Sequence, residues 1–426
     1  MYEGISGTTT VDITMSYMTA EGRQPPSRFD IVYLAPQNLQ EGIFSRCQAL
    51  AIELARSFRV LYVNPDCYSL PHLLYDWCFR RYSRRRPGVR SISSNLWTAD
   101  LVTLVPNALG LPSNRLRMWT AAQHLRRAIH QLGFENCILW TGLPWAVSMV
   151  KHIRASLVCY DCMDDFPLMF QGRWRHVFQA LDSELLQVSD LVITSSEELH
   201  ARCGKANANV HLVRNGVAVN LYSGDGLVPP SDLQKIRRPI LGYIGHIAHW
   251  VDLELLEALA ARYPEASLVI VGPVAVPVRG LSNLPNVHFL GLKPFAEVPR
   301  YIREFDVCLI PFRFNDLTAA VNPIKLYEYC AAGKPIVSVA LPELEPFRKL
   351  CYLARSHNEF LEAISAALKE VDDPHVAAKL AADRRKVAEE SSWEIRGREV
   401  EAVLLKSMER KRLLSFRSAA GQWGQS

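Results

Sequence analysis

Short apolar runs alternate with longer segments of helical period along most of the chain. The run Ile31-Val32-Tyr33-Leu34 comes first. Residues 44–58 then place apolar side chains at the spacing of an amphipathic helix, and a second apolar run follows at 59–63. This alternation is typical of parallel strands joined by helices that cover the sheet. The pattern therefore predicts an α/β fold.

The alternation occurs twice, on either side of a polar, proline-bearing segment. Residues 214–238 begin Arg-Asn-Gly and contain Pro229-Pro230, which is a composition typical of an interdomain connection. We therefore predict five parts: a leader at 1–28, a Rossmann-like domain at 29–213, a linker at 214–238, a second Rossmann-like domain at 239–391, and a C-terminal helix at 392–426 that returns towards the first domain.

Further elements follow from the same periodicities. In the first domain we expect strands at 101–105, 136–140, 156–160 and 190–194, and helices at 113–132, 173–188 and 196–203. In the second we expect strands at 240–244, 267–271, 287–290, 306–311 and 335–339, helices at 251–263, 295–304, 324–332 and 357–370, and a charged helical tail at 376–412. Both domains are then doubly wound, and open sheets of this kind bind ligands beyond the carboxyl ends of their strands. Two such domains facing one cleft would hold a ligand between them.

The composition agrees with two folded domains. The chain has 426 residues, 49% hydrophobic and 21% charged, which is enough to bury two cores. A net charge of +5 is small for this length and argues against a nucleic-acid partner. The ten cysteines are scattered, mostly in apolar runs, as expected in a reducing compartment. No apolar stretch reaches about 18 residues, and the first 28 residues lack the pattern of a secretory signal, so we predict a cytoplasmic protein.

The run from Asn322 to Pro335 contains the most informative chemistry. Pro323 suits the start of a helix, where the free amides of Ile324 and Lys325 would point from a positive helix end towards a phosphate. Glu328 lies one helical turn beyond Ile324, where its carboxylate could accept hydrogen bonds from a ribose diol. The run therefore predicts a nucleotide site.

This run resembles the nucleotide-sugar site of GT-B glycosyltransferases of the family-four type (glycosyl transferases group 1), in the branch of teichuronic acid and exopolysaccharide biosynthesis. The similarity extends over about residues 29–400 and includes the turn at 215–217 and the strands and turns at 241–246, 269–273 and 286–291. The resemblance implies two Rossmann-like doubly wound domains facing a cleft, with the acceptor bound by the first and the donor by the second. It implies transfer of a sugar from a nucleotide sugar to a glycan or lipid-linked acceptor, with retention and without a bound metal or other cofactor, in the assembly of a cell-surface or exported polysaccharide.

The resemblance also assigns a role to single residues and marks a departure. In such enzymes the carboxylate at the position of Glu328 holds the ribose. The glutamate that the family places eight residues earlier is Ala320 here, so the usual contact to the donor sugar is missing. Asp316 and Asn315 are the alternatives for that contact.

A second departure concerns the diphosphate. The turn after the strand at 240–244 usually offers an arginine and a lysine, whereas His246, His249 and Trp250 stand here. Lys325 and Arg313 are the best remaining cations for the diphosphate, and we predict Lys325 to be catalytic. The other residues that we expect to bind the donor are Glu328, Ile324, Asn322, Arg313, Gly245 and His246.

The first domain offers two adjacent acids. Asp164 and Asp165 follow the strand at 156–160 and are expected at its carboxyl end, where they could bind an acceptor hydroxyl or act as a general base. The alternative is an N-cap cluster for the helix near 173, and we expect neighbouring Asp161 to be structural. Gly42, in the loop after the first strand, is the glycine available for close approach to a substrate.

Other functions remain to be weighed. Gly242 and Gly245 lack the third glycine of the dinucleotide fingerprint, which argues against a dehydrogenase. Cys159-x-x-Cys162 has no second pair at zinc-like spacing, and His246-x-x-His249 has no glutamate between its histidines, so we predict no metal site. A sugar-nucleotide epimerase, a glycan phosphorylase and a catalytically silent nucleotide-sugar-binding homologue remain open, and Ala320 favours the last.

Six arginines lie between Arg80 and Arg90, beside Trp77, Phe79 and Tyr82. Basic and aromatic residues in one segment suit an anionic membrane surface, because the aromatic rings enter the interface while the bases meet the headgroups. We therefore expect a peripheral protein at the inner face of the plasma membrane. The alternatives are a solvated loop and an RNA contact.

We predict that the protein sediments with anionic vesicles at low ionic strength and is released as salt is added, because attraction between exposed charges is screened. Changing Arg84, Arg85 and Arg86 to serine should remove most of the sedimentation, since each base near the surface contributes about 1 kcal/mol. Equal sedimentation of both proteins, or of neither, would identify the segment as an ordinary solvated loop.

Overall fold

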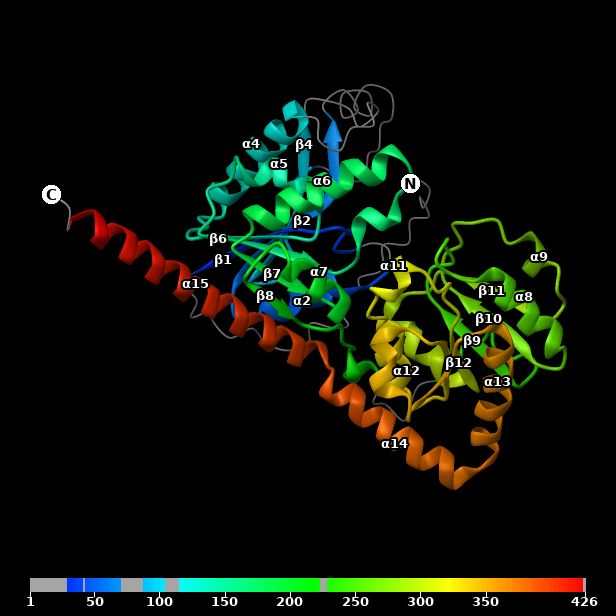
Figure 1. Cartoon of the computed structure of the whole chain (residues 1–426). Coiled ribbons are helices and arrows are strands. Elements are labelled where there is room, and N and C mark those ends of the chain that lie inside the picture. Colours follow the sequence, from blue (N-terminus) through cyan, green and yellow to red (C-terminus); the bar gives the residue numbers. More distant parts are fainter. Residues whose placement is uncertain (1–28, 41–42, 70–86, 104–114, 223–227, 424–426) are drawn as a thin grey trace. The chain divides into compact units, whose positions relative to one another are not determined.

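Two sheets, each in its own part of the chain, organise the protein (Figure 1). The computed structural model describes residues 29–40, 43–69, 87–103, 115–222 and 228–423. Unit 1 comprises Met1–Thr194, Leu199–Val213 and Gly397–Ser426, and unit 2 comprises Ser195–Glu198 and Arg214–Arg396. Both units are α/β, so the predicted fold class is confirmed.

Unit 1 holds an eight-stranded sheet with the order β3-β4-β2-β1-β5-β6-β7-β8. Neighbouring strands are parallel except β3 and β4, which are antiparallel. The strands are β1 (Asp30–Leu34), β2 (Arg59–Ser69), β3 (Gly88–Ser91), β4 (Leu96–Thr103), β5 (Ile138–Thr141), β6 (Leu157–Cys162), β7 (Leu191–Thr194) and β8 (Val210–Leu212).

The helices of unit 1 cover both faces of its sheet. They are α2 (Arg46–Leu54), α4 (Arg115–Gln131), α5 (Val147–Val150), α6 (Arg173–Val188) and most of α7 (Glu197–Gly204). Along α6, the buried residues Phe178, Leu181 and Leu185 follow one another at helical spacing. Helices α4, α5 and α6 contact one another along one face. Helix α2 joins strands that progress in the other direction across the sheet, so a right-handed crossover places it on the opposite face.

Unit 2 holds a six-stranded parallel sheet with the order β11-β10-β9-β12-β13-β14. Its strands are β9 (Ile240–Ile244), β10 (Ser267–Val271), β11 (Val287–Gly291), β12 (Val307–Ile310), β13 (Ile336–Val339) and β14 (Cys351–Ala354). Its helices are α8 (Leu253–Arg262), α9 (Arg279–Ser282), α10 (Val298–Glu304), α11 (Asp316–Ala319), α12 (Ile324–Ala331), α13 (His357–Asp372) and α14 (Pro374–Glu390).

Three strands were not predicted, and all three lie at sheet edges. Strands β3 and β8 are the outer strands of unit 1, and β14 is an outer strand of unit 2. They contain at most four residues each, and many of those residues are only half-buried. An edge strand is covered less than a central one, so its sequence lacks the continuous apolar run by which the inner strands are recognised.

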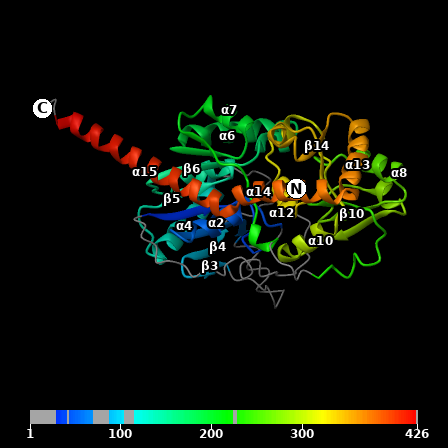
Figure 2. The ribbon, with the colours of Figure 1, turned by 90° about the horizontal axis from the view of Figure 1, so that it is seen from below.

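The tail predicted as one helical stretch is two helices, α14 and α15 (Trp393–Trp423), which follow one another in Figures 1 and 2. Between them, Ser391 accepts a hydrogen bond from the amide of Val217 at 3.0 Å. A Cβ on Gly216 would lie 2.6 Å from the Ser391 carbonyl oxygen, so this pairing requires glycine there. From Gly397 onward α15 belongs to unit 1, where Ser57 Oγ donates to Glu401 at 3.0 Å.

Candidate functional site

The carboxyl ends of three neighbouring strands in unit 2 are tied together by the loop after β9. The amide of Gly245 donates to the carbonyl of Val271, the last residue of β10, at 2.8 Å. The amide of Asp252 donates to the carbonyl of Pro311, just after β12, at 2.8 Å. This loop is therefore held at both ends, at the edge where parallel sheets bind ligands.

The start of α12 is fixed by Asn322, whose side chain is buried. Its Oδ1 accepts from the amide of Asn215 at 2.9 Å, and its Nδ2 donates to Glu343 at 2.9 Å and to Tyr327 at 3.1 Å. The side chain of Asn215 in turn donates to the carbonyl of Asn322 at 2.6 Å. Since both polar atoms of the Asn322 side-chain amide are engaged within the protein, Asn322 positions the start of the helix, and the direct donor contact that we expected of it stays a prediction.

The N-terminus of α12 presents free backbone donors. Pro323 precedes the first helical residue and no side chain caps this end. The first amides of a helix have no intrahelical acceptor, so Ile324 and Lys325 offer N–H groups at the positive end of the helix dipole. This arrangement suits a phosphate.

Lys325 extends from this helix to the loop after β9. A Cβ on Gly245, whose φ is +147°, would lie 2.6 Å from the Lys325 Nζ, so only glycine leaves room for the ammonium. The Nζ lies 5.6 Å from the ring centre of Tyr243 and 5.9 Å from that of Phe312. Lys325 makes no hydrogen bond or ion pair with any residue that the structure describes. Burial lowers the pKa of this ammonium, and the nearby Glu328 carboxylate acts in the opposite direction.

Glu328 and Tyr222 lie on the other side of Lys325 from the loop after β9. Within the described ranges the carboxylate of Glu328 accepts no hydrogen bond, and burial raises its pKa while Lys325 lowers it. The hydroxyl of Tyr222 is buried and has no hydrogen-bond partner among the residues that the structure describes, and burial and Glu328 raise its pKa well above the ordinary value. Tyr222 was not predicted, because it lies in the segment interpreted as a linker and no motif marks it.

His246 completes the group on the side of the loop. Its Nε2 is buried and has no hydrogen-bond partner in the described part of the chain, and its ring meets that of Trp250 edge-on at 5.6 Å between centres. Burial lowers its pKa, and Lys325 and His249 lower it further, which favours the neutral imidazole. Four polar groups without a hydrogen-bond partner among the described residues, on His246, Lys325, Glu328 and Tyr222, thus follow one another at one edge of the sheet. Polar groups in such surroundings cost free energy until a ligand supplies their partners.

The remaining predicted donor residues differ in what they can offer. Arg313 is exposed; its amide donates to the carbonyl of Trp250 at 2.8 Å, so it lies at the same edge as the loop after β9. Asn315 caps α11, accepting from the amide of Thr318 at 3.0 Å, so its oxygen is already used. Asp316 is exposed and is the freer of the two alternatives.

Ala320, at the position of the family's glutamate, is buried. Its carbonyl accepts a hydrogen bond from Ser196 Oγ at 2.6 Å. The amide of Glu197 likewise donates to Glu343 at 2.8 Å. These contacts explain why Ser195–Glu198 belongs to unit 2 although its neighbours in the chain belong to unit 1.

In unit 1, Asp161 forms a fully buried ion pair. Arg46 Nε lies 3.0 Å from Asp161 Oδ1, and Arg46 Nη1 donates to the carbonyl of Val213 at 2.8 Å. Tyr33 adds a hydrogen bond to the same carboxylate at 3.4 Å. This geometry supports the structural role that we expected of Asp161.

Asp164 is placed differently, just beyond the end of β6. It is half-buried and makes no ion pair with a described residue. Burial raises its pKa from the ordinary 3.8 to about 7, with smaller contributions from Asp161 and Asp165 in the same direction and from Arg46 against it. A carboxyl group that titrates near neutral pH can give and take a proton in catalysis.

Asp165 is engaged by Arg202. The guanidinium of Arg202 lies 3.4 Å from Asp165 and 2.7 Å from Asp182. Burial raises the pKa of Asp165, and Arg202 acts against this. The residue before α6 is Gly172, so the alternative of an N-cap for that helix is wrong. Of the two predicted acids, Asp164 is therefore the one available for chemistry.

An aromatic cluster adjoins these acids. Its members are Trp145, Phe166, Phe170, Trp174 and Phe178. The rings of Phe170 and Phe178 stack with centres 4.1 Å apart, and Trp145 lies 5.2 Å from Phe166. All but Phe178 are partly exposed. The sequence shows aromatic residues here, but their convergence depends on the fold.

Some predicted features lie outside the described residues, namely Gly42 and Arg80–Arg86. Arg90 is described, and it pairs with Asp100 at 2.7 Å. Among the described residues, no three His, Cys, Asp or Glu side chains are grouped so as to hold a metal ion. No described helix combines the length and the apolar character that crossing a membrane requires.

Comparison with known proteins agrees with this geometry. Residues 238–370 match the family described as Glycosyl transferases group 1. Over 231 residues the chain is 31% identical to the putative teichuronic acid biosynthesis glycosyltransferase TuaH of Bacillus subtilis, a match that covers 50% of this chain and 58% of TuaH. The match thus spans rather more than half of that relative.

Solved structures show the same fold. Sucrose-phosphate synthase from Thermosynechococcus elongatus is similar with a TM-score of 0.68 at 15% identity, over 89% of this chain and 99% of that one. Anabaena HepE in complex with UDP-glucose is similar with a TM-score of 0.62 at 15% identity, over 88% and 99%. WaaG, a glycosyltransferase involved in lipopolysaccharide biosynthesis, gives 0.57 at 13% identity, over 87% and 98%. The predicted GT-B fold and the resemblance to group 1 glycosyltransferases are confirmed.

We predict that Asp164 makes the protein less stable as the pH rises. The folded chain keeps the Asp164 proton up to a pH of about 7, whereas the unfolded chain releases it near 3.8, so the free energy of unfolding falls between these values. Asp164→Asn should remove this fall in the free energy of unfolding. The upper bound of the fall is about 4 kcal/mol, and the actual value is smaller because solvent reaches the side chain.

The measurement is urea unfolding of both proteins at pH 5 and pH 8, with the exposed Glu135→Gln as control. An equal loss of stability in wild type and Asp164→Asn between the two pH values would contradict the raised pKa.

Proposed function

We propose that this chain, which carries a glycosyl transferases group 1 domain in a GT-B fold, is a glycosyltransferase. It transfers a sugar from a nucleotide-sugar donor to a glycan or lipid-linked acceptor. The observation that carries this proposal is the row of polar groups on His246, Lys325, Glu328 and Tyr222, which no described residue partners, beside the uncapped start of α12. A nucleoside diphosphate offers these groups the phosphates and ribose hydroxyls that they lack.

The donor binds to unit 2 in two places. Its diphosphate accepts hydrogen bonds from the amides of Ile324 and Lys325, and the Lys325 ammonium, which no described residue neutralises, supplies the opposing charge. The ribose hydroxyls donate to Glu328, which has no other donor among the described residues. Relatives place cations in the loop that holds Gly245 and His246, whereas here this loop leaves room for the phosphates. The exposed Arg313 adds positive charge at the same edge of the sheet.

Transfer breaks the bond between the anomeric carbon and the phosphate oxygen and forms a bond to the acceptor oxygen. The negative charge that grows on the leaving diphosphate is stabilised by Lys325 and by the dipole of α12, and this stabilisation is greatest in the transition state. Asp164, whose pKa is about 7, takes the proton of the acceptor hydroxyl. We further propose retention of the anomeric configuration and compensation of the diphosphate charge by protein groups in place of a metal ion.

The aromatic cluster of unit 1 suggests how the acceptor binds. Exposed faces of Trp145 and Trp174 can stack on a sugar ring or an isoprenoid chain next to Asp164. The name of TuaH supports a role in cell-surface polysaccharide assembly, and the UDP-glucose complex of HepE supports a nucleotide-sugar donor. A cytoplasmic enzyme held at the membrane by Arg80–Arg90 could reach lipid-linked acceptors.

One observation favours a second candidate, a homologue that binds nucleotide sugars without transferring them. The buried Ala320 stands where relatives place a glutamate, and alanine offers no side-chain polar group for the donor sugar. An epimerase or a glycan phosphorylase on the same fold is separated from a transferase by the products of the reaction.

We predict that the protein releases free nucleotide from at least one nucleotide sugar. Lys325→Ala should lower kcat by about 10²–10³-fold and change the donor affinity less. Loss of a group that stabilises transition-state charge has an effect of this size on kcat in other enzymes. The assay measures nucleotide release over a panel of nucleotide sugars, with the exposed Lys379→Ala as control. Interconversion of the sugar would identify an epimerase, and binding without turnover the silent homologue. A phosphorylase would instead form sugar 1-phosphate when it is given a glycan and inorganic phosphate.

We predict that Glu328→Gln weakens donor binding by about 2–3 kcal/mol, because the ribose loses a charged acceptor. Tyr222→Phe should weaken it by about 0.5–1.5 kcal/mol, the value of one neutral hydrogen bond. Calorimetric titration with the nucleoside diphosphate measures both, and the exposed Glu362→Gln serves as the matched control. Affinity of Glu328→Gln within twofold of wild type would remove Glu328 from the site.

A further inference from the structure

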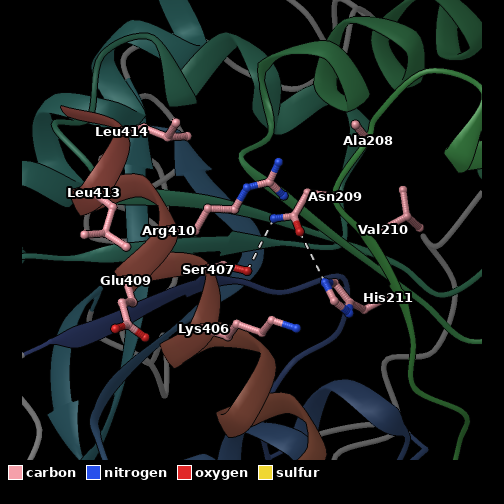
Figure 3. A pocket seen from close by; sticks show the side chains of 10 residues that line it. All are labelled: Ala208, Asn209, Val210, His211, Lys406, Ser407, Glu409, Arg410, Leu413 and Leu414. Atoms are coloured by element: carbon pink, nitrogen blue, oxygen red, sulfur yellow. Dashed lines mark hydrogen bonds between the residues drawn. The ribbon is translucent and has the colours of Figure 1, made fainter. Parts of the chain in front are cut away.

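A pocket of about 550 Å³ lies within unit 1, between β8 and α15 (Figure 3). Ala208, Asn209, Val210 and His211 line it from the strand, and residues between Lys406 and Leu414 line it from the helix. Its volume falls within the range of small-molecule sites, about 300–1,000 Å³. No residue of the candidate donor or acceptor site contributes to it.

Two cations of α15 face this pocket without a counter-ion in the described part of the chain. Lys406 and Arg410 are four residues apart, so they lie on the same side of the helix, and Figure 3 shows both side chains extending from α15 towards β8. Neither makes an ion pair with a described residue. Lys411 on the same helix, by contrast, pairs with Asp190 at 2.6 Å. The pocket therefore holds uncompensated positive charge.

The strand side of the pocket adds polar groups and feels this charge. His211 Nε2 lies 3.2 Å from Asn209 Oδ1, and Asn209 Nδ2 lies 3.3 Å from Ser407 Oγ. Burial lowers the pKa of His211, and Lys406, His200 and Arg410 lower it further. Glu409 is the acidic residue of the lining, and Figure 3 shows its carboxylate on the side of α15 away from β8.

The helix end of the pocket is apolar and exposed. Leu413 and Leu414 line it, and 57% of the surface of each is exposed. Apolar side chains beside uncompensated cations match a ligand that is anionic at one end and apolar at the other. A free inorganic anion would leave the leucines unused.

We infer that the pocket between β8 and α15 binds the phosphate-bearing headgroup of an amphiphile. Lys406 and Arg410 hold the phosphate, and His211 lies within reach of its oxygens from the strand. Leu413 and Leu414 contact the beginning of the apolar chain. The pocket is separate from the donor site, so this binding does not depend on the proposed transfer reaction.

The test is calorimetric binding of two soluble probes to the full chain: dihexanoyl phosphatidic acid below its micelle concentration, and glycerol 3-phosphate. We expect the amphiphile to bind more tightly than glycerol 3-phosphate. Changing Lys406 and Arg410 together to glutamine should weaken both probes by at least about tenfold, because each charge-assisted hydrogen bond to phosphate is lost. Changing Leu413 and Leu414 to serine should weaken the binding of the amphiphile and leave the binding of glycerol 3-phosphate unchanged.

A matched control removes two lysines from α14, Lys379→Gln with Lys386→Gln, which are exposed and lie in unit 2. All substituted side chains are exposed, and thermal unfolding of each variant checks that it folds. Unchanged affinity in the Lys406 and Arg410 variant, or equal weakening in the control, would overturn the site. Equal affinity for both probes would show that the pocket binds phosphate without an apolar chain, which would overturn the proposal of an amphiphile. Co-sedimentation with vesicles containing phosphatidic acid, compared with phosphatidylcholine alone, shows whether the ligand is bound within a membrane.

Discussion

The side-chain amide of Asn322 is the interaction on which the candidate donor site depends. It is buried, and it joins the turn at Asn215 to the start of α12 and to the carboxylate of Glu343. Each of these hydrogen bonds is worth about 1 kcal/mol, but removing Asn322 would leave several buried polar groups unpaired, which costs more. Because the network fixes where α12 begins, it also fixes Lys325 and Glu328, which stand within the first two turns of that helix.

The two units use buried charge in opposite ways. In unit 1, the charges of Arg46 and Asp161 neutralise each other in a buried ion pair, and Arg46 also donates to the carbonyl of Val213, so the pair organises the end of β6. In unit 2, Lys325 and Glu328 lie near each other without forming an ion pair with each other or with any other described residue. Charges that are held in place but left without hydrogen-bond partners are arranged for a ligand, because binding then needs little rearrangement.

The same contrast separates the two aspartates after β6. Asp164 and Asp165 are adjacent in the chain and have the same chemistry, yet Arg202 engages only Asp165. Asp164 has no such partner among the described residues, and burial brings its pKa to about 7. In unit 2, the neighbours Asn315 and Asp316 differ in the same way. The side chain of Asn315 caps α11, whereas Asp316 is exposed.

The sequence by itself determined the α/β class and most of the inner strands, because a strand covered on both faces needs a continuous apolar run. It also marked the start of α12 and the residues Lys325 and Glu328, since helix starts and charge spacing are local properties. Only the tertiary structure showed that Asn322 is engaged, that Tyr222 joins Glu328, and that Arg202 distinguishes Asp165 from Asp164. It also revealed the edge strands β3, β8 and β14 and brought β8 beside α15. These outcomes depend on contacts between residues far apart in the chain, and burial at a sheet edge is too slight to leave a local pattern.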